Sequence, residues 1–525
     1  MRRWPGLVLL VVVAWAYWPV TAGDFVIDDY VFLAASRMVS APWTALWQSH
    51  FYEPYYFRPL GVLSWWLAQR VFGLDYAAHS LINLALHALN IGLLAALLRG
   101  LGVAAWPRWG GVALFALAPF SLGAALWPSN RFDLLAVAAL LLLAILIRRA
   151  LATPERGVSG RSLVAIALCA LAACWSKELA YPVAGVLGGL ALFVPSAARR
   201  VGWRVFAAVA VTVVAAFAWR HAMLGGAYAA VVSDPLAALR LGLVALADRG
   251  VVLAGAAGLV VLAGVLVAAL LLRRARSSVS VRAVLAVATV WVAATLVQTP
   301  LAHLFASMVD GSSLGTVTFA RFYYAPWAAG CALLAVMAAR ARGSGVLSMV
   351  VIGVAASFAF AMHRLATDFA GWAQREVRPF ALTATAATEA VAGDGQGGSC
   401  ATVLLGSEQR HPYFRMFADV TVKARTTLPD SVWRCYVLAE STPWIFVFPA
   451  GEGAPVDLPL RPIVNPDGRA KADAVWDGVR YRYRLPPTSA SALSGARYFE
   501  WRDGRFVDVT ESVQSGARSV TFHDW

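Results

Sequence analysis

The stretch "AHSLINLALHALNIGLLAALL", residues 78–98, decides the fold class of this chain. It contains no Asp, Glu, Lys or Arg, and a helix of about 20 apolar residues crosses the hydrocarbon core of a bilayer. Similar apolar runs recur along the chain. We predict eleven membrane-spanning helices, at residues 5–22, 78–98, 109–126, 133–148, 162–176, 180–195, 204–222, 250–272, 283–300, 323–340 and 345–362. The predicted fold is mainly α, a polytopic membrane bundle.

Composition and charge agree with a membrane protein. Of the 525 residues, 60% are hydrophobic and 14% are charged, and the net charge is +15. If the N-terminus is cytoplasmic, one set of connections holds 17 arginines and one acid, Glu155, by direct count. Residues 375–525 hold 17 basic and 17 acidic residues, so the excess belongs to the membrane part. This asymmetry follows the positive-inside rule, and such dispersed charge argues against a nucleic-acid partner.

The N-terminal segment, residues 1–24, has two interpretations. Its basic start, apolar centre and small residues are typical of a cleavable secretory signal. We favour an uncleaved anchor, because the later spans continue the alternation of sides and cleavage would leave Asp28 on a loose terminus. The chain is then a multi-pass protein of the inner (plasma) membrane with a cytoplasmic N-terminus.

Composition becomes polar and glycine-rich after the last predicted span. We therefore divide the chain into a transmembrane domain, residues 1–374, and an extracytoplasmic domain, residues 375–525, which is long enough for its own core. Alternating runs beside the Asp-Gly pairs at 477–478 and 503–504 indicate β-hairpins. We predict a strand-rich α+β domain.

The five cysteines divide between the two predicted domains. Cys169, Cys174 and Cys331 lie inside predicted spans, and Cys400 and Cys435 lie in the tail. Two cysteines in an oxidising compartment allow one intrachain pairing. We predict a Cys400–Cys435 disulfide, with a free pair of thiols as the alternative.

About 55 residues separate the first two predicted spans, far more than a plain connection between helices needs. Residues 30–73 mix aromatic, charged and apolar side chains, which suits short helices in the membrane interface. The Trp and Tyr residues form an aromatic belt on one interpretation. On the other, they stack on a sugar or guide a polyprenyl chain.

The span at 78–98 carries a polar face. His79, Asn83, His87 and Asn90 follow at spacings of four, four and three, so they share one side of a helix. The two histidines are roughly 12 Å apart along the axis, too far to chelate one metal without other ligands. The polar residues of this face have two possible roles, hydrogen bonding between helices and direct contact with a substrate.

Four polar clusters fall on the acid-rich side of the predicted membrane. They are Asp28 and Asp29; Asn130, Arg131 and Asp133; Ser176, Lys177 and Glu178; and Arg321, Tyr323 and Tyr324. Taken singly, each is a snorkelling or paired charge at a membrane edge. Taken together, carboxylates and cations at one membrane level indicate a site for an anionic, lipid-borne substrate.

These residues also carry a resemblance. "FVIDDYVF", "FRPLGVLSWWLAQRVFGLDYAAHSLINLALHALN", "LWPSNRFDLLA", "WSKELAYP" and "ARFYYAP" occur in the order seen in the C superfamily of membrane glycosyltransferases. The chain most resembles bacterial relatives of the transmembrane and tetratricopeptide-repeat O-mannosyltransferases, and more distantly the protein O-mannosyltransferases and aminoarabinose transferases. The resemblance covers roughly residues 1–375. The chain lacks the tetratricopeptide repeats of these relatives, which puts a protein acceptor bound through repeats in doubt.

The resemblance implies sugar transfer from a polyprenyl-phosphate carrier to an acceptor hydroxyl of a glycan, lipid or protein on the outer face of the membrane. By its match to the family's acidic position, Asp28 is the expected general base and Asp29 the second choice. Asp133 is expected to orient the acceptor or assist the base. A single displacement inverts the anomeric centre.

The leaving phosphate needs cations already in place, and we expect Lys177 and Arg321 to supply them, with Arg131 third. Further expected substrate contacts are Glu178, Arg58, His79, Asn83, His87 and Tyr324. Some superfamily members use a divalent metal, but the sequence offers no compact ligand set, and we predict no metal or other cofactor. The expected partners are the lipid-linked donor, membrane lipids and the acceptor.

Two other classes of function fit the bulk composition. A secondary transporter or lipid flippase would place charges along a central path through the membrane. A non-catalytic membrane scaffold would keep the fold and use its outer domain for binding. The long first loop and the charges gathered on one side favour chemistry at the membrane surface.

Overall fold

The structure is a computed structural model that describes most of the helical part of the chain and fragments of the tail. The described residues are 4–26, 28–38, 41–47, 57–224, 240, 244, 280–306, 320–340, 344–393, 402–405, 424–425, 437–439, 473–476, 481–484, 487–488, 497–517 and 522–523. The chain divides into two compact units. The first comprises residues 1–22, 41–227 and 235–370, and the second comprises 23–40, 228–234 and 371–525.

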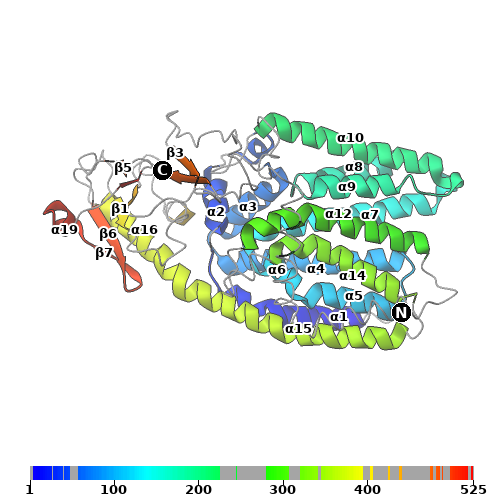
Figure 1. Ribbon diagram of the computed structural model, residues 1–525, viewed down its shortest axis with the longest axis horizontal. Helices are drawn as coiled ribbons and strands as arrows, with labels where there is room; N and C mark the ends of the chain where they lie inside the picture. The colour runs from blue at the N-terminus through cyan, green and yellow to red at the C-terminus, as the bar shows by residue number, and fades with distance from the viewer. Residues whose placement is uncertain are drawn as a thin grey trace. The chain divides into compact units, whose positions relative to one another are not determined.

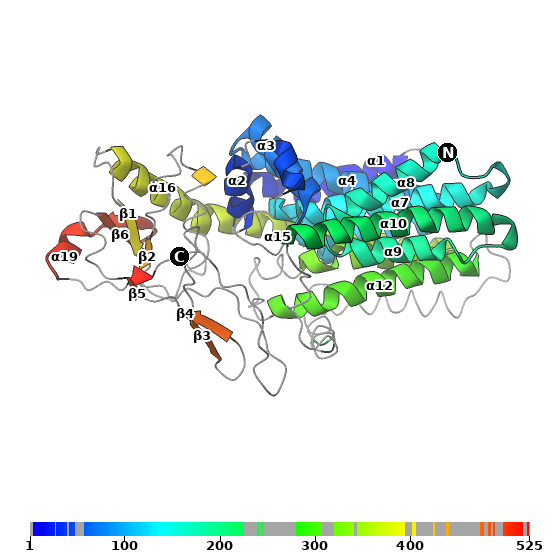
Figure 2. The same cartoon turned by 90° about the horizontal axis from the view of Figure 1, so that it is seen from above.

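The first unit is a bundle of long helices that run side by side (Figures 1 and 2). Its α-helices are α1 (Trp4–Tyr17), α3 (Pro59–Phe72), α4 (Tyr76–Gly100), α5 (Ala105–Leu117), α6 (Leu122–Leu126), α7 (Arg131–Ala152), α8 (Gly160–Cys174), α9 (Ala180–Leu190), α10 (Arg199–Leu224), α12 (Val281–Ala306), α14 (Tyr324–Ala338) and α15 (Ser344–Trp372). Its 3₁₀ helices are η1 (Trp18–Ala22), η2 (Pro42–Leu46), η3 (Pro119–Ser121), η4 (Pro128–Asn130), η5 (Pro154–Arg156), η6 (Ser196–Ala198) and η8 (Arg321–Tyr323). Ten of the eleven predicted spans coincide with helices, and the eleventh, 250–272, lies outside the described residues.

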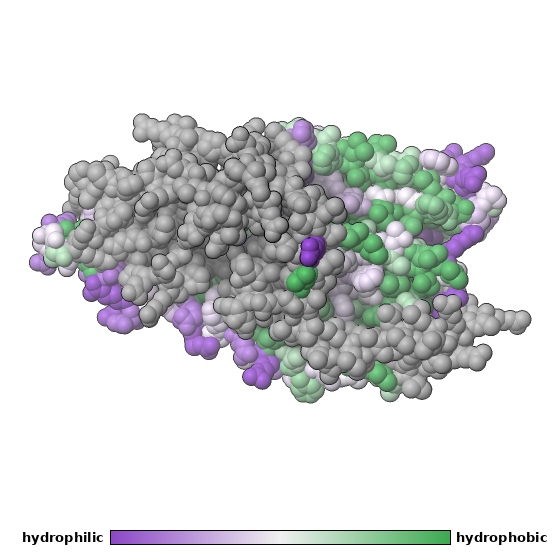
Figure 3. Space-filling model, in the orientation of Figure 1, coloured by the Kyte–Doolittle hydropathy of each residue, from purple (hydrophilic) through white to green (hydrophobic). Residues whose placement is uncertain are grey.

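Six stretches of described helix are long and apolar enough to cross a membrane, and a bent pair adds a seventh. At two other predicted spans, the shorter apolar helices α8 and α9 have 15 and 11 residues. On the face shown in Figure 3, hydrophobic residues cover the described helices of the bundle, and hydrophilic residues gather at its right-hand end. The predicted polytopic helical bundle is confirmed, although the described residues hold fewer full-length spans than predicted.

The bent pair lies at the predicted span 109–126. Helix α5 ends at Leu117 because Pro119 has no N–H to continue the helix, and Ala118 before it takes an extended conformation (φ −76°, ψ 152°). The chain restarts as η3 and α6 at an angle of 56° to α5. The break exposes backbone carbonyls that other side chains must satisfy.

Glycine permits a close helix crossing between α5 and α14. A Cβ atom on Gly111 would lie 2.7 Å from the Cβ of Ala335 and 2.8 Å from the carbonyl oxygen of Cys331. Real Cβ atoms do not approach this closely, so only glycine fits without moving α14. This contact packs α14 closely against α5. Helix α14 begins at Tyr324, one of the candidate site residues.

We predict that Gly111→Leu destabilises the protein by about 1–3 kcal/mol, because overpacking forces the two helices apart. The matched control is Gly92→Leu on α4, where a Cβ meets no atom within 4 Å. Unfolding of both variants in mixed detergent micelles measures the difference. Equal stability of the two variants would contradict the crossing.

The described residues of the second unit form β-strands and the helices α2 (Asp28–Met38), α16 (Arg378–Gly393) and α19 (Thr510–Gln514), with a π-helical turn at Ala373–Val377. Its strands are β1 (Thr402–Leu405), β2 (Val437–Ala439), β3 (Asp473–Trp476), β4 (Tyr481–Arg484), β5 (Pro487–Thr488), β6 (Arg497–Arg502), β7 (Arg505–Asp508) and β8 (Phe522–His523). One sheet has the order β5-β8-β2-β1-β6-β7, and β3 pairs with β4. The predicted strand-rich part is confirmed, but the parallel pairing of β1 with β2 and β6 was not predicted.

Both predicted hairpins have paired strands. Strands β6 and β7 are antiparallel, and their loop residues Asp503 and Gly504 have φ angles of 48° and 78°. Two positive φ values match the tight turn that Asp-Gly favours. Strands β3 and β4 are antiparallel on either side of residues 477–480, which lie outside the described residues. The predicted disulfide partners, Cys400 and Cys435, also lie outside them.

Candidate active site

The polar face of helix α4 points into the bundle, where Asn83 binds backbone carbonyls at the end of α6. Asn83 is fully buried, and its Nδ2 donates to the carbonyl oxygens of Trp127 at 3.0 Å, Ala124 at 3.3 Å and Pro128 at 3.4 Å. These carbonyls belong to the irregular segment around α6. Asn83 therefore fixes the segment that leads into α7.

Two further polar residues of α4 bind across the bundle. His87 Nδ1 lies 2.8 Å from the hydroxyl of Tyr324, and its Nε2 lies 3.1 Å from the carbonyl oxygen of Ala116. Asn90 Nδ2 donates to Tyr324 at 3.1 Å and to the carbonyl oxygen of Leu134 at 3.0 Å. These contacts join α4 to α5, α7 and α14. They support hydrogen bonding between helices as the role of this face.

Arg131 is fully buried at the start of α7. Its Nε donates to Asn83 Oδ1 at 3.1 Å, Nη2 donates to the carbonyl oxygen of His79 at 3.2 Å, and Nη1 donates to that of Ser64 at 3.3 Å. The guanidinium also lies 4.7 Å from the ring of Trp65. Arg131, the third expected phosphate ligand, thus ties α7 to α3 and α4.

Asp133 and Lys177, which were expected to have separate roles, form one ion pair. Lys177 Nζ lies 2.5 Å from Asp133 Oδ2, and the residues are 9% and 2% exposed. Asp133 stands in the first turn of α7, and Lys177 stands between α8 and α9. Burial lowers the pKa of Lys177, Asp133 opposes this shift, and the cations Arg58 and Arg321 add to it. Burial is the main reason that the pKa of Lys177 is lowered, and Asp133 is its directly bonded carboxylate.

A second ion pair follows directly in the chain. Glu178 accepts from Arg58 Nε at 3.1 and 3.0 Å and from its Nη2 at 2.7 Å, which is a bidentate geometry. Burial alone raises the pKa of Glu178, but Arg58 and Arg220 lower it below its ordinary value. Arg58 also lies 5.3 Å from the ring of Phe132.

Cations outnumber carboxylates in the group that these interactions define. We call it the cation cluster: Arg58, Lys177, Arg220 and Arg321 with Asp133 and Glu178. Arg220 near the end of α10 is 5% exposed, and Arg321 lies 5.0 Å from the ring of Trp127 and 4.9 Å from that of Phe322. The cluster thus gathers four cations and two carboxylates among the described residues. Such a cluster favours an anionic ligand.

The cation cluster offers little to a metal ion. Across the part of the chain that the structure describes, no group of three or more His, Cys, Asp or Glu side chains is placed to hold one. The two carboxylates of the cluster are each bonded to a cation. Its chemistry is that of an anion site.

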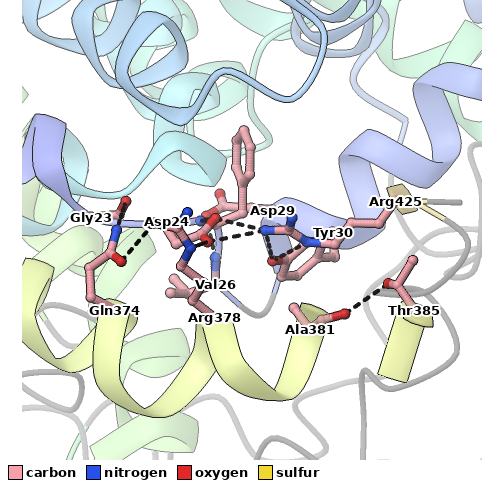
Figure 4. Close-up of polar contacts among 11 residues, drawn as sticks. Gly23, Asp24, Val26, Asp29, Tyr30, Gln374, Arg378, Ala381, Thr385 and Arg425 are labelled. Atoms are coloured by element: carbon pink, nitrogen blue, oxygen red, sulfur yellow. Dashed lines mark hydrogen bonds and ion pairs between the residues drawn. The ribbon is translucent and has the colours of Figure 1, made fainter. Parts of the chain in front are cut away.

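The acidic segment after α1 belongs to the second unit, where its carboxylates have different environments (Figure 4). Asp28 is half-buried at the start of α2. Asp29 is fully buried, and its Oδ2 accepts the backbone N–H of Val26 at 2.9 Å. Asp28 is the more accessible carboxylate of the pair.

Asp24 makes the main ion pair of this segment. Its Oδ1 accepts from Arg425 Nη2 at 2.9 Å, and Arg378 Nε lies 3.8 Å from its Oδ2. Arg425 also donates to the hydroxyl of Tyr30 at 2.9 and 3.0 Å (Figure 4). Arg425 thus holds both sides of the turn that carries Asp28.

Sequence reasoning missed Arg220 and Arg425. Arg220 lies inside the predicted span 204–222, where its charge was the available signal, since an arginine inside a span is costly without a partner or ligand. Arg425 lies in "TVKARTT", residues 421–427, which matches no motif. Its partner Asp24 is 401 positions away in the chain.

Comparison with known proteins gives only a remote likeness. No protein-family model matches the chain, and no curated protein matches it. Among the solved structures that are similar to this chain are two of ArnT from Cupriavidus metallidurans, each with 14% sequence identity to it. The apo state has a TM-score of 0.46 over 79% of this chain and 84% of that one, and the form bound to undecaprenyl phosphate has 0.48 over 93% and 98%. At these scores the likeness supports no argument about function.

We predict that Arg425→Ala loosens α2, because Asp24 and Tyr30 lose the guanidinium that joins them. Amide hydrogen exchange of residues 24–38 should become at least ~10-fold faster, since removing one partner of a buried pair is strongly destabilising. Arg505→Ala, at an exposed position of β7 in the same unit, is the control. Unchanged exchange in Arg425→Ala is the result that contradicts this role.

Proposed function

We propose that this chain is a membrane glycosyltransferase of the C superfamily that transfers a sugar from a polyprenyl-phosphate carrier to an acceptor hydroxyl. The observation that carries the proposal is the cation cluster, an anion site at the ends of membrane-type helices. The resemblance of the sequence motifs to the superfamily supports its choice. The proposed location is the inner membrane, with a cytoplasmic N-terminus and the C-terminal domain outside.

The cation cluster suits a lipid phosphate as leaving group. When the bond between the anomeric carbon and the phosphate oxygen breaks, negative charge grows on the phosphate and needs fixed cations. Arg321 and Arg58 offer planar guanidinium groups, and Lys177 offers a compact charge. Phosphate oxygens replace the carboxylates of Asp133 and Glu178 as partners of Lys177 and Arg58.

Asp28 is the proposed general base. It matches the acidic position of the family motif, and it is less buried than Asp29, whose Oδ2 already accepts a backbone N–H. The acceptor oxygen attacks the anomeric carbon, its proton goes to the Asp28 carboxylate, and polyprenyl phosphate leaves. This single displacement inverts the anomeric centre. The donor sugar is proposed to be a hexose, and the acceptor a hydroxyl of a glycan, lipid or protein.

The positions of the charges favour this function over transport. Asp133 lies in the first turn of α7, Lys177 lies between α8 and α9, and Arg321 lies just before α14. A transporter needs polar groups along a path through the bundle. The buried polar residues of α4 described above instead bind neighbouring helices.

We expect Asp28→Asn to lower turnover at least ~100-fold, the usual scale for removing a general base. Purified protein in lipid nanodiscs is incubated with polyprenyl-phosphate sugars, and released polyprenyl phosphate is measured. Asp368→Asn, at an exposed position of α15, is the matched control. Unchanged turnover in Asp28→Asn excludes Asp28 as the base. If the wild type turns over no donor, the result favours the alternative that the protein is a non-catalytic membrane scaffold.

We further predict that Lys177→Gln weakens binding of undecaprenyl phosphate at least ~10-fold, because a charge-assisted contact is lost. Asp133→Asn should bind at least as tightly as wild type, because it removes the carboxylate that competes with the phosphate. Both variants break the same ion pair, so each controls for the structural effect of the other. Equal weakening in both would show that the pair acts only in folding.

A further inference from the structure

A large apolar cavity lies between α4, α7, α9, α12 and α14. Its volume is about 430 Å³, and its described lining consists of Leu, Val, Ile and Ala side chains with a single charged residue, Arg148. The cavity is partly open, and an apolar group that enters it gains dispersion contacts with these side chains. The cavity therefore calls for an apolar occupant.

Arg148 lies at one end of the cavity, in the last part of α7. Its Nη1 donates to the carbonyl oxygen of Gly100 at 3.0 Å. Its Nε is buried and has no hydrogen-bond partner among the described residues. A buried donor left unsatisfied is costly, and an anionic oxygen would complete it.

This charged end is separate from the cation cluster. Arg148 follows Asp133 by fifteen residues on the same helix, which is roughly 22 Å at 1.5 Å per residue. Arg148 belongs to the arginine-rich set of connections, which the positive-inside rule assigns to the cytoplasmic side. Basic pockets between transmembrane helices on that side bind anionic lipid headgroups.

We propose that the cavity holds one hydrocarbon chain of an anionic glycerophospholipid whose phosphate binds Arg148. A cavity of about 430 Å³ with apolar walls has room for a hydrocarbon chain. Arg148, the single charged group among the described lining residues, sets the orientation, with the phosphate at Arg148 and the chain among the apolar residues. This lipid is a structural ligand of the bundle, independent of the proposed sugar transfer.

The test measures thermal unfolding of delipidated protein in nonionic detergent with dioleoyl phosphatidylglycerol, dioleoyl phosphatidylcholine or undecaprenyl phosphate. Phosphatidylglycerol should raise Tm by about 5 °C, and phosphatidylcholine by much less, because only the native state binds the lipid. Native mass spectrometry of the wild type should show one tightly bound phosphatidylglycerol. Arg148→Gln should lose the selectivity for the anionic lipid.

Two more variants complete the test. Ala144→Leu fills part of the lining and should abolish the rise in Tm, whereas Arg149→Gln, at the exposed neighbouring position, should keep it. Equal effects of the two phospholipids, or an effect that survives both Arg148→Gln and Ala144→Leu, overturns the proposal. A rise only with undecaprenyl phosphate assigns the cavity to a polyprenyl chain and also overturns it.

Discussion

The hydrogen bonds of Asn83 to the end of α6 are the interaction on which the entry into α7 depends. Within hydrocarbon, a backbone carbonyl freed by a helix break finds no water, so another part of the protein must satisfy it. Asn83 satisfies the carbonyl oxygens of Ala124, Trp127 and Pro128 with one amide group. The Oδ1 of Asn83 also accepts a hydrogen bond from Nε of Arg131, the first residue of α7. Position and direction of α7 thus follow from one buried amide.

That constraint separates structural from reactive polar groups. The polar face of α4 is used in holding α5, α7 and α14, so its residues are fixed partners within the protein. The ionisable groups at the helix ends are paired instead with each other, as in Asp133–Lys177 and Arg58–Glu178. A salt bridge can exchange its carboxylate for a phosphate without loss of the surrounding hydrogen bonds.

Local properties were predictable from the sequence, whereas partners distant in the chain were not. The length of the apolar runs predicted the helices, and the pair Asp503-Gly504 predicted the β6–β7 hairpin. Each prediction depends on neighbouring residues alone. Pro119, inside the predicted span 109–126, was a visible signal of the bend that the prediction did not use. The pairing of Asp133 with Lys177 joins residues 44 positions apart, and that of Arg58 with Glu178 joins residues 120 apart. Only the packed bundle decides such pairs.

The bidentate bond between Arg58 and Glu178 has a consequence for selection among lipids. A bilayer presents neutral and zwitterionic lipids in large excess over any carrier lipid. A neutral headgroup supplies no charge to replace Glu178, so displacing that carboxylate leaves a cation and an anion uncompensated at low dielectric. A phosphate compensates the charge of Arg58, so that only the displaced carboxylate loses its partner. If the cation cluster binds the carrier phosphate as proposed, the closed salt bridge acts as a charge filter that disfavours neutral membrane lipids.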